Sequence, residues 1–530
     1  MPDHSIPKLK ELFSSGRIGR RQFMSGAIYS GLTVTLASAV ADRVQAATPR
    51  RGGHLNVGHA HGATSDSRDP GHFENGFQNA MTFGYNGYLT KVGLDGTVQP
   101  DLAESWESTP DATQWTFRIR EAEFHNGRTV TAQDVVTSLN HHRGEKSTSA
   151  AKPLMSAVRD IRADGDRTIV VTLDAGNADF PFIVTDYHMP VMQDDDGRMD
   201  WKSMIGCGAY KVDHYEPGRT SELSRHENHW SDDVAFFDTV QQIALIDPNA
   251  RTSALVAGDV DVIDRIDLKT AGLLGRRPGV NIHSTTGTQH YTMPMRCDTP
   301  PFDDVNVRRA LKHAINRQEL LDKILFGYGE VGNDIPIGSN QRFYNSNLPQ
   351  TEYDPDKARH YLKEAGLDSL SVSLSSSETA FAGAIDAAVL YQASAAKCGI
   401  DINVVREPND GYWSDVWMKK PWCVSYFGGR PVEDMTFSTM YESTAAWNDS
   451  FWKNDRFDSL LVQARAELDE DRRREMYHEM QAILHDDGGV VIPLFAAYVF
   501  AMNDSIGHTG EFASNWDLDG ERFMERWWKV

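Results

Sequence analysis

The sequence predicts a mixed α/β protein built from more than one lobe. Stretches with the two-residue periodicity of strands alternate along the chain with stretches that have helical periodicity. A chain of 530 residues also exceeds what one hydrophobic core usually organises. The chain contains no low-complexity tract and no internal repeat. Several α/β lobes are therefore expected.

Strands are predicted where apolar residues alternate with polar ones or form short runs. Residues 54–59 (HLNVGH) and 115–120 (WTFRIR) alternate, and residues 168–173 (TIVVTL) form a short apolar run after a Gly-Asp turn. Residues 488–500 (GGVVIPLFAAYVF) predict a buried strand region that Pro493 interrupts, because proline cannot donate a ladder hydrogen bond.

Helices are predicted from their capping residues and apolar faces. Thr131 is the expected N-cap of one helix, and Asp134 at its third position closes a capping-box-like pair. Asp354, followed by Pro355 at the first helical position, begins a second helix that ends at Gly366. Residues 456–485 hold two more helical patterns. Within residues 303–316, one helical face carries Val307, Ala310, Leu311, Ala314 and Ile315.

The N-terminal residues have the pattern of an export signal. Arg20 and Arg21 precede Gln22-Phe23, a mildly apolar run covers residues 26–41, and Val44-Gln45-Ala46 fits a cleavage site. A retained membrane anchor is the alternative, but the run is short and rich in Gly, Ser and Thr. We therefore expect residues 1–46 to be a twin-arginine signal peptide and the rest to be a free periplasmic protein.

Charge and cysteine content exclude several classes of function. The net charge of −22 becomes −25 once the three net positive charges of residues 1–46 are removed. Such a surface repels phosphate backbones, so nucleic acid is not an expected partner. The four cysteines are no disulfide framework, although one pair could be oxidised after export, and no Cys/His metal spacing occurs. The 12 Trp and 17 Tyr suit a binder of sugars, peptides or amines.

Five sequence blocks, in this order, resemble extracellular solute-binding proteins of the dipeptide/oligopeptide/nickel type (family 5). Each block alone is weakly specific, and the order of all five carries the resemblance. The blocks are FRIR…FHNG…TAQDVV (117–136), GCGAYK…EPG…NHW (206–230), LVAGDVD (255–261), PPFDDVNVRRA (300–310) and YDPDKA (353–358).

This resemblance implies a fold, a partner and a division into domains. The fold would be two hinged α/β lobes of the cluster C-like type, with an extra domain inserted in the first lobe and the ligand enclosed between the lobes. Lobe I would comprise residues 47–82, 202–296 and 492–530, the inserted domain residues 83–201, and lobe II residues 297–491. The expected partners are a small-molecule or peptide ligand and the permease subunits of an ABC importer, with the chain itself a monomer. No GxxxxGK[ST] motif occurs, so the chain is not the ATPase.

One segment departs from the pattern of the peptide-binding members. There, a stretch after a Trp in the second lobe supplies an Asp that pairs with the ligand's α-ammonium. The corresponding stretch here is WCVSYFGGRPVED (422–434). Counting forward from Trp422 places Ser425 at the Asp position, and counting backward from Phe437 places Arg430 there. Neither residue is an acid.

The energetic cost of lacking an acid at this position is large enough to change the expected ligand. An unpaired ammonium in a dry cleft costs several kcal/mol, and one serine hydrogen bond returns only about 1 kcal/mol. Arg430 would repel an ammonium and would grip a carboxylate with two N–H groups. We therefore expect a small polar solute or modified peptide with an acidic group near Arg430. Alternatively, Arg430 forms a structural ion pair with Glu433 or Asp434, or one of these two acids turns into the cleft and restores the missing anchor.

Further candidate ligand-binding residues surround this loop or follow from the resemblance. Aromatic residues beside the loop would form a wall for the ligand or belong to the core. Two residues before the Pro-Pro block lie on what the family makes an inter-lobe crossing strand that faces the cleft. These candidates are Tyr426, Phe427, Trp447 and Trp413 for the wall, and Tyr291 and Arg296 for the crossing strand.

The sequence favours a binding protein over an enzyme and contains no cofactor motif. No GxSxG or HExxH occurs, and Asp194–Asp196 and Asp486–Asp487 have the composition of solvated loops. His59 and His61 fit a strand end and a loop better than a metal site. The rival interpretations are an ordinary di- or oligopeptide binder, a nickel or haem binder of the same family, and an exported hydrolase.

Overall fold

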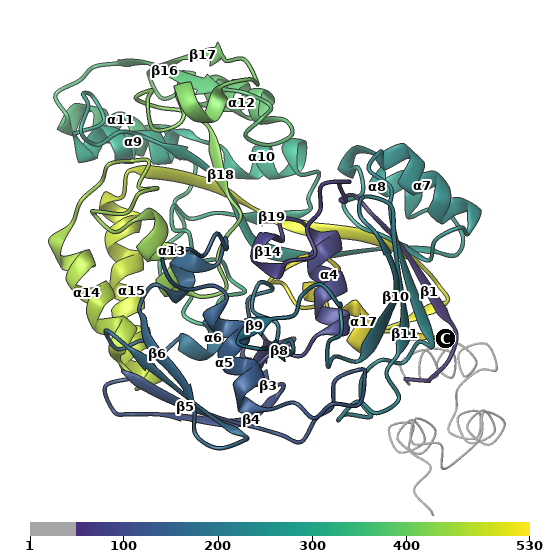
Figure 1. The fold of residues 1–530 in the computed structure, drawn as a ribbon. Coiled ribbons are helices and arrows are strands. Elements are labelled where there is room, and N and C mark those ends of the chain that lie inside the picture. The colour runs from purple at the N-terminus through teal and green to yellow at the C-terminus, as the bar shows by residue number, and fades with distance from the viewer. Residues whose placement is uncertain (1–48) are drawn as a thin grey trace, which may run out of the picture.

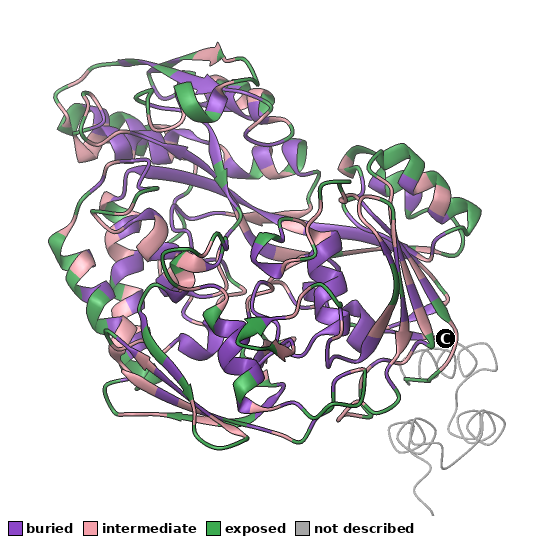
Figure 2. Cartoon of the chain, in the orientation of Figure 1, coloured by how far each residue is buried: buried purple, intermediate pink, exposed green. Residues whose placement is uncertain are grey.

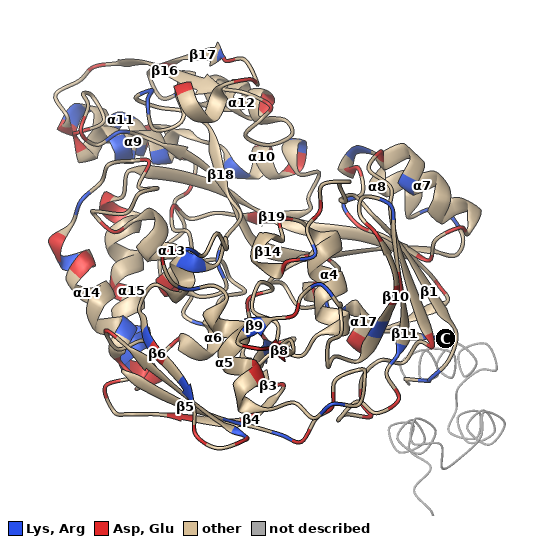
Figure 3. Ribbon diagram, in the orientation of Figure 1, with Lys and Arg blue, Asp and Glu red and all other residues tan. Residues whose placement is uncertain are grey.

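The computed structural model describes residues 49–530, so the predicted signal peptide lies outside the described residues. Within them the fold is mixed α/β, as the sequence predicts, and no helix combines the length and apolarity that spanning a bilayer requires. Figure 1 shows three parts arranged around two long strands. Figure 3 shows acidic and basic residues interspersed along the ribbon of all three parts.

The two long strands, β14 (Val280–Pro294) and β19 (Val490–Asn503), connect the parts. They pair antiparallel along most of their length, from Val280 opposite Asn503 to Pro294 opposite Val490. β13 (Val262–Ile263) pairs with the C-terminal half of β19, whereas β15 (Gly329–Val331) pairs with its N-terminal half. β18 (Ser425–Phe427) pairs with the C-terminal half of β14. One nine-stranded sheet therefore extends from the lobe I residues into the lobe II residues.

The register of this pair breaks midway between the two halves. Thr286 lies opposite Ala497 and His290 opposite Phe495, so three residues of β14 face a single residue of β19. Gly287 stands in this break, and a Cβ there would lie 2.4 Å from the Tyr498 ring. Such a β-bulge bends and twists a strand locally.

The lobe I residues form the parallel and antiparallel strands beside β13. The sheet order is β10-β11-β12-β1-β13-β19, and β1 pairs in parallel with both β12 and β13. The elements are β1 (His54–His59), α4 (Gly76–Tyr85), β10 (Tyr210–Glu216), β11 (Thr220–Arg225), β12 (Thr239–Ala244), α7 (Pro248–Ala257), α8 (Leu268–Leu274), β20 (Ile506–Gly507), α16 (Asp517–Gly520), α17 (Phe523–Arg526) and β21 (Trp528–Lys529).

The residues of the predicted inserted domain build a separate four-stranded antiparallel sheet in the order β4-β5-β7-β6. Figure 1 shows this sheet at the bottom of the view, with α5 and α6 above it. The elements are β2 (Thr90–Val92), β3 (Val98–Pro100), β4 (Ala103–Ser108), β5 (Gln114–Ile119), α5 (Ala132–Asn140), β6 (Val158–Ala163), β7 (Thr168–Leu173), α6 (Phe180–Ile183), β8 (Asp194–Asp195) and β9 (Arg198–Met199).

The lobe II residues fall into two helical groups around the other ends of β14 and β19. One group carries the parallel pair β16–β17, and the other packs three helices beside α6 (Figure 1). The first holds α9 (Val305–Ala314), α10 (Arg317–Ile324), α11 (Pro355–Glu364), β16 (Leu370–Ser376), α12 (Ala384–Ala396) and β17 (Ile400–Arg406); the second holds α13 (Glu433–Met440), α14 (Asp455–Ala466) and α15 (Glu470–Asp487).

Each part has its own apolar core (Figure 2). One core lies between Leu89 and Cys207, a second joins β1, α4 and the C-terminal helices, and two more fill the lobe II groups. The predicted domain boundaries remain a prediction, and the cores cross them: Cys207 packs with the core that begins at Leu89, whereas Met192 and Met199 pack with β1 and α4.

The predicted elements are found, with one correction. The predicted strands are β1, β5, β7 and β19, and the predicted helices are α5, α9, α11, α14 and α15. Asp134 accepts from the backbone N–H and hydroxyl of Thr131, both at 2.8 Å, and Asp354 caps α11. The expected interruption at Pro493 is wrong: β19 continues, because Pro493 lies in a bulge between Val491 and Leu494, where no ladder N–H is needed.

All four cysteines are free thiols in this structure, so no oxidised pair forms among them. Cys207, Cys398 and Cys423 are buried, and Cys297 is half-buried. Burial raises the pKa of all four thiols, that of Cys297 to about 11. Because the thiolate is the reactive form, these cysteines are chemically inert.

A buried ion triad joins the inserted domain to lobe II. Asp179, 2 % exposed at the start of α6, accepts from Arg342 at 2.8 Å and from the buried Arg473 of α15. Burial alone would raise the pKa of Asp179, but Arg473 and Arg342 hold it below its ordinary value. The backbone N–H of Ala178 also donates to the carbonyl of Arg465. The two parts are therefore connected through charge as well as packing.

Replacing Asp179 with Asn should destabilise the protein, because Arg473 would lose its counter-charge and Arg342 would keep only the more exposed Glu470. Breaking a buried ion pair by removing one partner costs about 3–5 kcal/mol. We expect Asp179→Asn to lower the free energy of unfolding in urea by this amount. The control is Asp174→Asn, an exposed position on the preceding loop, which should change it by less than about 0.5 kcal/mol. Equal urea midpoints for the two variants would show that the triad does not stabilise the fold.

Candidate ligand-binding site

β18 places the first predicted site residues on two faces of one strand. Ser425 pairs with Thr292 of β14, and Tyr426 pairs with Tyr291. Because side chains alternate along a strand, Ser425 and Phe427 share one face and Tyr426 lies on the other. Ser425 and Phe427 are buried, whereas the Tyr426 side chain is 38 % exposed.

An aromatic wall extends from Tyr426 through the loops on either side of β18. We use this name for Trp413, Trp417, Tyr426 and Trp447. The ring centroids of Trp413 lie 5.9 Å from Tyr426 and 6.0 Å from Trp417, and those of Trp417 and Trp447 lie 6.3 Å apart. All three contacts are edge-to-face, the geometry that aromatic pairs prefer. Trp413 and Trp447 keep 38 % and 43 % of their surface exposed, so the wall presents ring faces to solvent.

Arg430 lies at the end of the aromatic wall. Its guanidinium carbon is 5.7 Å from the centroid of the Trp447 ring, and one N–H group donates to the carbonyl of Gly429 at 2.8 Å. Burial lowers the pKa of Arg430, while Asp186 and Tyr187 of the inserted domain act in the opposite direction. The charges of Asp186 and Tyr187 therefore act on the Arg430 guanidinium.

The predicted alternative, an ion pair from Arg430 to Glu433 or Asp434, is wrong. Glu433 is buried and accepts from the backbone N–H of Phe343 at 2.8 Å. Asp434 is buried and accepts from Arg465 at 2.9 Å. Both acids are the first residues of α13, whose N-terminus turns them inward. Among the described residues, no carboxylate lies within ion-pair distance of Arg430, and neither acid restores the missing anchor.

Ser425 retains an unused hydrogen-bonding group. Its hydroxyl is buried without a hydrogen-bond partner, as is the hydroxyl of Thr292 opposite. Two orphaned hydroxyls side by side can serve a polar ligand group, but they supply no charge. Their combined contribution to binding a charged group is small, about 1 kcal/mol for each hydrogen bond.

The other predicted residues are engaged in contacts within the protein, although Tyr291 pairs with Tyr426 of the aromatic wall. Tyr291 stacks on Phe381 at a centroid distance of 3.7 Å and is buried, which raises its pKa to about 12. Phe427 belongs to a buried cluster. Arg296 binds Asp298 through two N–H groups at 3.0 and 2.8 Å. The ligand contacts of these three residues remain predictions, and the structure brings together Arg430, Tyr426, Trp413 and Trp447 instead.

Sequence reasoning missed Tyr187 and Trp516, which come from other parts of the chain than Arg430. Tyr187 follows α6, and its ring lies 5.8 Å from Trp516, which precedes α16. Burial raises the pKa of Tyr187, Asp186 and Glu521 raise it further, and Arg430 lowers it. Residues from the inserted domain, lobe I and lobe II thus meet around one hydroxyl. No periodicity or motif marks Tyr187, because its position depends on the packing of three domains.

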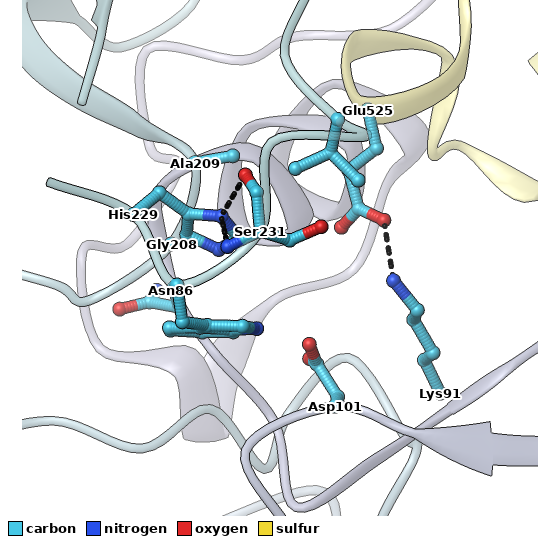
Figure 4. Close-up of a pocket in the computed structure, with 10 residues that line it drawn as sticks. Asn86, Lys91, Asp101, Gly208, Ala209, His229, Ser231 and Glu525 are labelled. Atoms are coloured by element: carbon cyan, nitrogen blue, oxygen red, sulfur yellow. Dashed lines mark hydrogen bonds and ion pairs between the residues drawn. The ribbon is translucent and has the colours of Figure 1, made fainter. Parts of the chain in front are cut away.

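Three cavities in the described part of the chain differ in volume and in the residues that line them. The pocket in Figure 4, of about 20 Å³, lies where Lys91 and Glu525 form a 3.3 Å ion pair and holds no more than a water molecule. A cavity of about 40 Å³ lies beside Pro431, between all three parts. A groove of about 800 Å³ is lined by residues of the inserted domain with Asn228 and Trp230, so lobe II does not cover it.

Within residues 49–530, no group of three or more His, Cys, Asp or Glu side chains is arranged to hold a metal ion. His59 lies at the end of β1, with Nδ1 3.3 Å from Asp264, and His61 lies in the following loop.

Comparison with known proteins identifies the family. The family model described as "Bacterial extracellular solute-binding proteins, family 5 Middle" matches residues 97–449, two thirds of the chain. The chain belongs to this family. The family 5 resemblance that the sequence blocks predict is therefore confirmed, and the fold is that of a periplasmic binding protein.

Relatives of this family 5 protein bind chemically different ligands, as their names state. It is 24 % identical over 444 residues to the dipeptide-binding protein of Escherichia coli K12, covering 76 % of this chain and 81 % of that one. It is 23 % identical over 445 residues to the nickel-binding periplasmic protein of the same organism, covering 77 % and 82 %. The structure of the PBP AgaA in complex with agropinic acid from A. tumefacien R10 superposes with a TM-score of 0.70 at 21 % identity, covering 90 % and 99 %.

Family membership fixes the general role. Family 5 proteins are ABC substrate-binding proteins, they bind small ligands or peptides, and they work with ABC permeases rather than as enzymes. The relatives are periplasmic binding proteins. At 21 to 25 % identity the ligand does not transfer, so the site residues of this chain have to be read individually.

Asp449, which accepts a hydrogen bond from Trp417 of the aromatic wall, should make the stability of this family 5 protein depend on pH. The Trp417 indole N–H donates to this buried carboxylate at 2.9 Å. Burial raises the pKa of Asp449 from 3.8 to about 7. Its ionisation therefore opposes folding, and stability is lost as the pH rises from about 4 to about 7.

Asp449→Asn removes this titration while keeping an oxygen for Trp417. The variant should match the wild type in thermal stability near pH 4 and exceed it near pH 7.5, measured by tryptophan fluorescence. The exposed Asp410 supplies a control, Asp410→Asn, whose stability should follow that of the wild type. A constant difference between Asp449→Asn and the wild type at all pH values would contradict the assignment.

Proposed function

We propose that this chain is the periplasmic solute-binding component of an ABC importer and captures a small, carboxylate-bearing solute or modified peptide between its lobes. The observation that carries the proposal is Arg430. It is half-buried, its pKa responds to Asp186 and Tyr187, and no carboxylate among residues 49–530 lies within ion-pair distance of it. Its guanidinium donates to the carbonyl of Gly429, and a ligand carboxylate can add two parallel, charge-assisted hydrogen bonds.

The aromatic wall supports the same ligand class. Trp413, Tyr426 and Trp447 offer exposed ring faces next to Arg430, and Trp447 lies under the guanidinium. Such rings can bury the apolar body of a solute whose acidic group reaches Arg430. The ligand contacts proposed here are therefore Arg430, Tyr426, Trp413 and Trp447, with the hydroxyl of Ser425 as an additional polar contact.

The absence of an acid at position 425 separates this proposal from an ordinary peptide binder. An α-ammonium at that position would meet only the hydroxyls of Ser425 and Thr292. A peptide held by its N-terminus would then lose the charge-assisted bond that members with Asp supply, worth about 1.5–3 kcal/mol.

A calorimetric panel tests the ligand class. Linear monocarboxylates, dicarboxylates and ordinary dipeptides are titrated into the wild type and into Arg430→Gln, which preserves length and polarity. We expect carboxylates to bind the wild type and to bind Arg430→Gln about ten- to hundredfold more weakly, the range of a charged hydrogen bond. Arg456→Gln, at an exposed ion pair with Glu479, is the matched control and should leave binding unchanged.

Two outcomes would overturn this ligand class. One is micromolar binding of ordinary dipeptides that Arg430→Gln does not weaken. The other is turnover of any panel member, which would favour an exported hydrolase. Native mass spectrometry of the protein purified from its own periplasm adds a direct identification, because a co-purified solute would reveal its mass.

Export by the twin-arginine route is part of the proposal and can be tested separately. Replacing Arg20 and Arg21 together by Lys should leave the chain in the cytoplasm with residues 1–46 attached, because the route depends on the arginine pair. Arg17→Lys, just outside the pair, should be exported normally. Cell fractionation and intact mass measure both outcomes, and periplasmic, processed protein from the double variant would argue against this route.

A further inference from the structure

A second cluster of charge lies in lobe I, at the carboxyl ends of β1 and β13. These two strands are parallel neighbours, so His59 at the end of one and Asp264 after the other emerge side by side. α16 and the residue after it add Asp517 and Glu521 from the far end of the chain. The carboxyl edge of a parallel sheet is where α/β proteins place their ligands.

Asp264 is the structural member of this cluster. It accepts from the backbone N–H of Ala60 at 2.7 Å, its other oxygen lies 3.3 Å from His59, and Arg251 approaches to 3.6 Å. Burial would raise its pKa, but His59 and Arg251 hold it below the ordinary value. Asp264 is therefore satisfied within the protein.

The other members present acceptor atoms that nothing in the described structure satisfies. Asp517 Oδ2, Glu521 Oε2 and Asn79 Oδ1 are buried without a hydrogen-bond partner. Their side chains are at most 6 % exposed. The nearest cation, Arg265, has Nε 3.7 Å from Asp517 Oδ2, beyond hydrogen-bond distance. Leaving a buried acceptor unpaired costs about 1–3 kcal/mol and more for a charged group, so three together indicate a missing donor.

The backbone leaves room for these groups to converge. Glu521 Oε1 approaches Gly76 at the N-terminus of α4 so closely that a Cβ there would lie 2.6 Å from it. Asn79 projects from the first turn of the same helix, and Asp517 begins α16. All three unsatisfied atoms are oxygens: the amide oxygen of Asn79 can only accept, and the carboxyl oxygens of Asp517 and Glu521 accept when ionised. The group that completes them must donate several hydrogen bonds and carry positive charge.

Both this cluster and Arg430 act electrostatically on Tyr187. The pKa of Tyr187 is raised by Glu521 of lobe I and lowered by Arg430 of lobe II. Trp516, whose ring centroid lies 5.8 Å from that of Tyr187, directly precedes Asp517.

We propose that Asp517, Glu521 and Asn79 form a subsite for a cationic group of the solute, a primary ammonium or a guanidinium. The proposal rests on the carboxylate contact at Arg430 and extends it: the solute is zwitterionic, with its acidic end on lobe II and its cationic end on lobe I. The ammonium partner that lobe II lacks at Ser425 is thus supplied by the opposite lobe. A zwitterion binds both lobes at once, so its two charges hold the lobes together.

Proton release should accompany binding at this subsite. Burial raises the pKa of Asp517 and Glu521, and Asp264 adds to the effect, while Arg265 opposes it. The other titratable groups around the cluster are His59, His61, whose pKa burial lowers to about 4, and Tyr498. A bound cation favours the ionised form of both carboxyls, so its binding should release protons. Affinity for a cationic solute should rise with pH as these protons become easier to remove.

The experiment uses three matched series of probes in calorimetry: linear monocarboxylates from propionate to octanoate, ω-amino acids of the same lengths, and the corresponding n-alkylamines. The proteins are the wild type, Glu521→Gln, Asp517→Asn and Arg430→Gln. Glu511→Gln, an exposed position on the preceding loop, is the control. Thermal unfolding verifies that each variant is folded, and two buffers of different ionisation enthalpy measure the protons released.

The proposal predicts that the best ω-amino acid binds at least tenfold more tightly than the monocarboxylate of equal length. Glu521→Gln and Asp517→Asn should remove this preference and the proton release while leaving monocarboxylate binding unchanged, and Glu511→Gln should retain both. Arg430→Gln should weaken both acid series.

The other outcomes separate this proposal from the proposed function. If acids bind through Arg430 but the amino group adds nothing, or Glu521→Gln weakens both acid series equally, the cationic subsite is wrong and the acid contact stands. If amines bind through Glu521 while acids do not bind, the acid contact is wrong and the subsite stands. If none of the three series binds, both are wrong.

Discussion

The antiparallel pairing of β14 with β19 is the interaction on which the rest of the structure depends. These two strands are the only segments of the described chain that hydrogen-bond within the sheet to partners from both lobes. The register break around Gly287 divides the pair into a lobe I half and a lobe II half. The residues on either side of this break are therefore positioned relative to one shared ladder. The inserted domain adds a second connection through Asp179, which ties it to lobe II.

The charges around the cleft are distributed in a way that the family pattern does not anticipate. The position where the resemblance expects an acid holds Ser425 when counted from Trp422 and Arg430 when counted from Phe437. The unsatisfied acids are on lobe I instead, at the ends of parallel strands. Relatives named for binding dipeptides and nickel share about a quarter of their residues with this chain over the matched length, so the sign of each wall has to be tested residue by residue.

Local sequence signals predicted local structure well. Caps such as Thr131 with Asp134, and Asp354 with Pro355, act within one turn of helix, so the sequence alone defines them. The arginines of the Pro-Pro block have a similarly clear role: Arg308 of α9 donates to the carbonyl oxygen of Asp487 at the C-terminus of α15. Pro493 was misjudged, since proline is compatible with a strand whose bulge leaves no N–H to pair.

The candidate site could be predicted only in part. Trp413, Tyr426, Arg430 and Trp447 lie close together in the sequence, so they could be proposed as one group from the sequence alone. Whether Arg430 pairs with Glu433 or Asp434 depends on where α13 points these acids, which periodicity does not show. Tyr187, Asp517 and Glu521 come from parts of the chain more than 300 residues apart, and only tertiary packing brings them together. The same chain has an experimental advantage in its four inert thiols. A cysteine introduced at a solvent-exposed position of the aromatic wall would be the one thiol in the described chain that readily takes up a fluorescent dye, which would turn the native protein into an optical sensor of its solute.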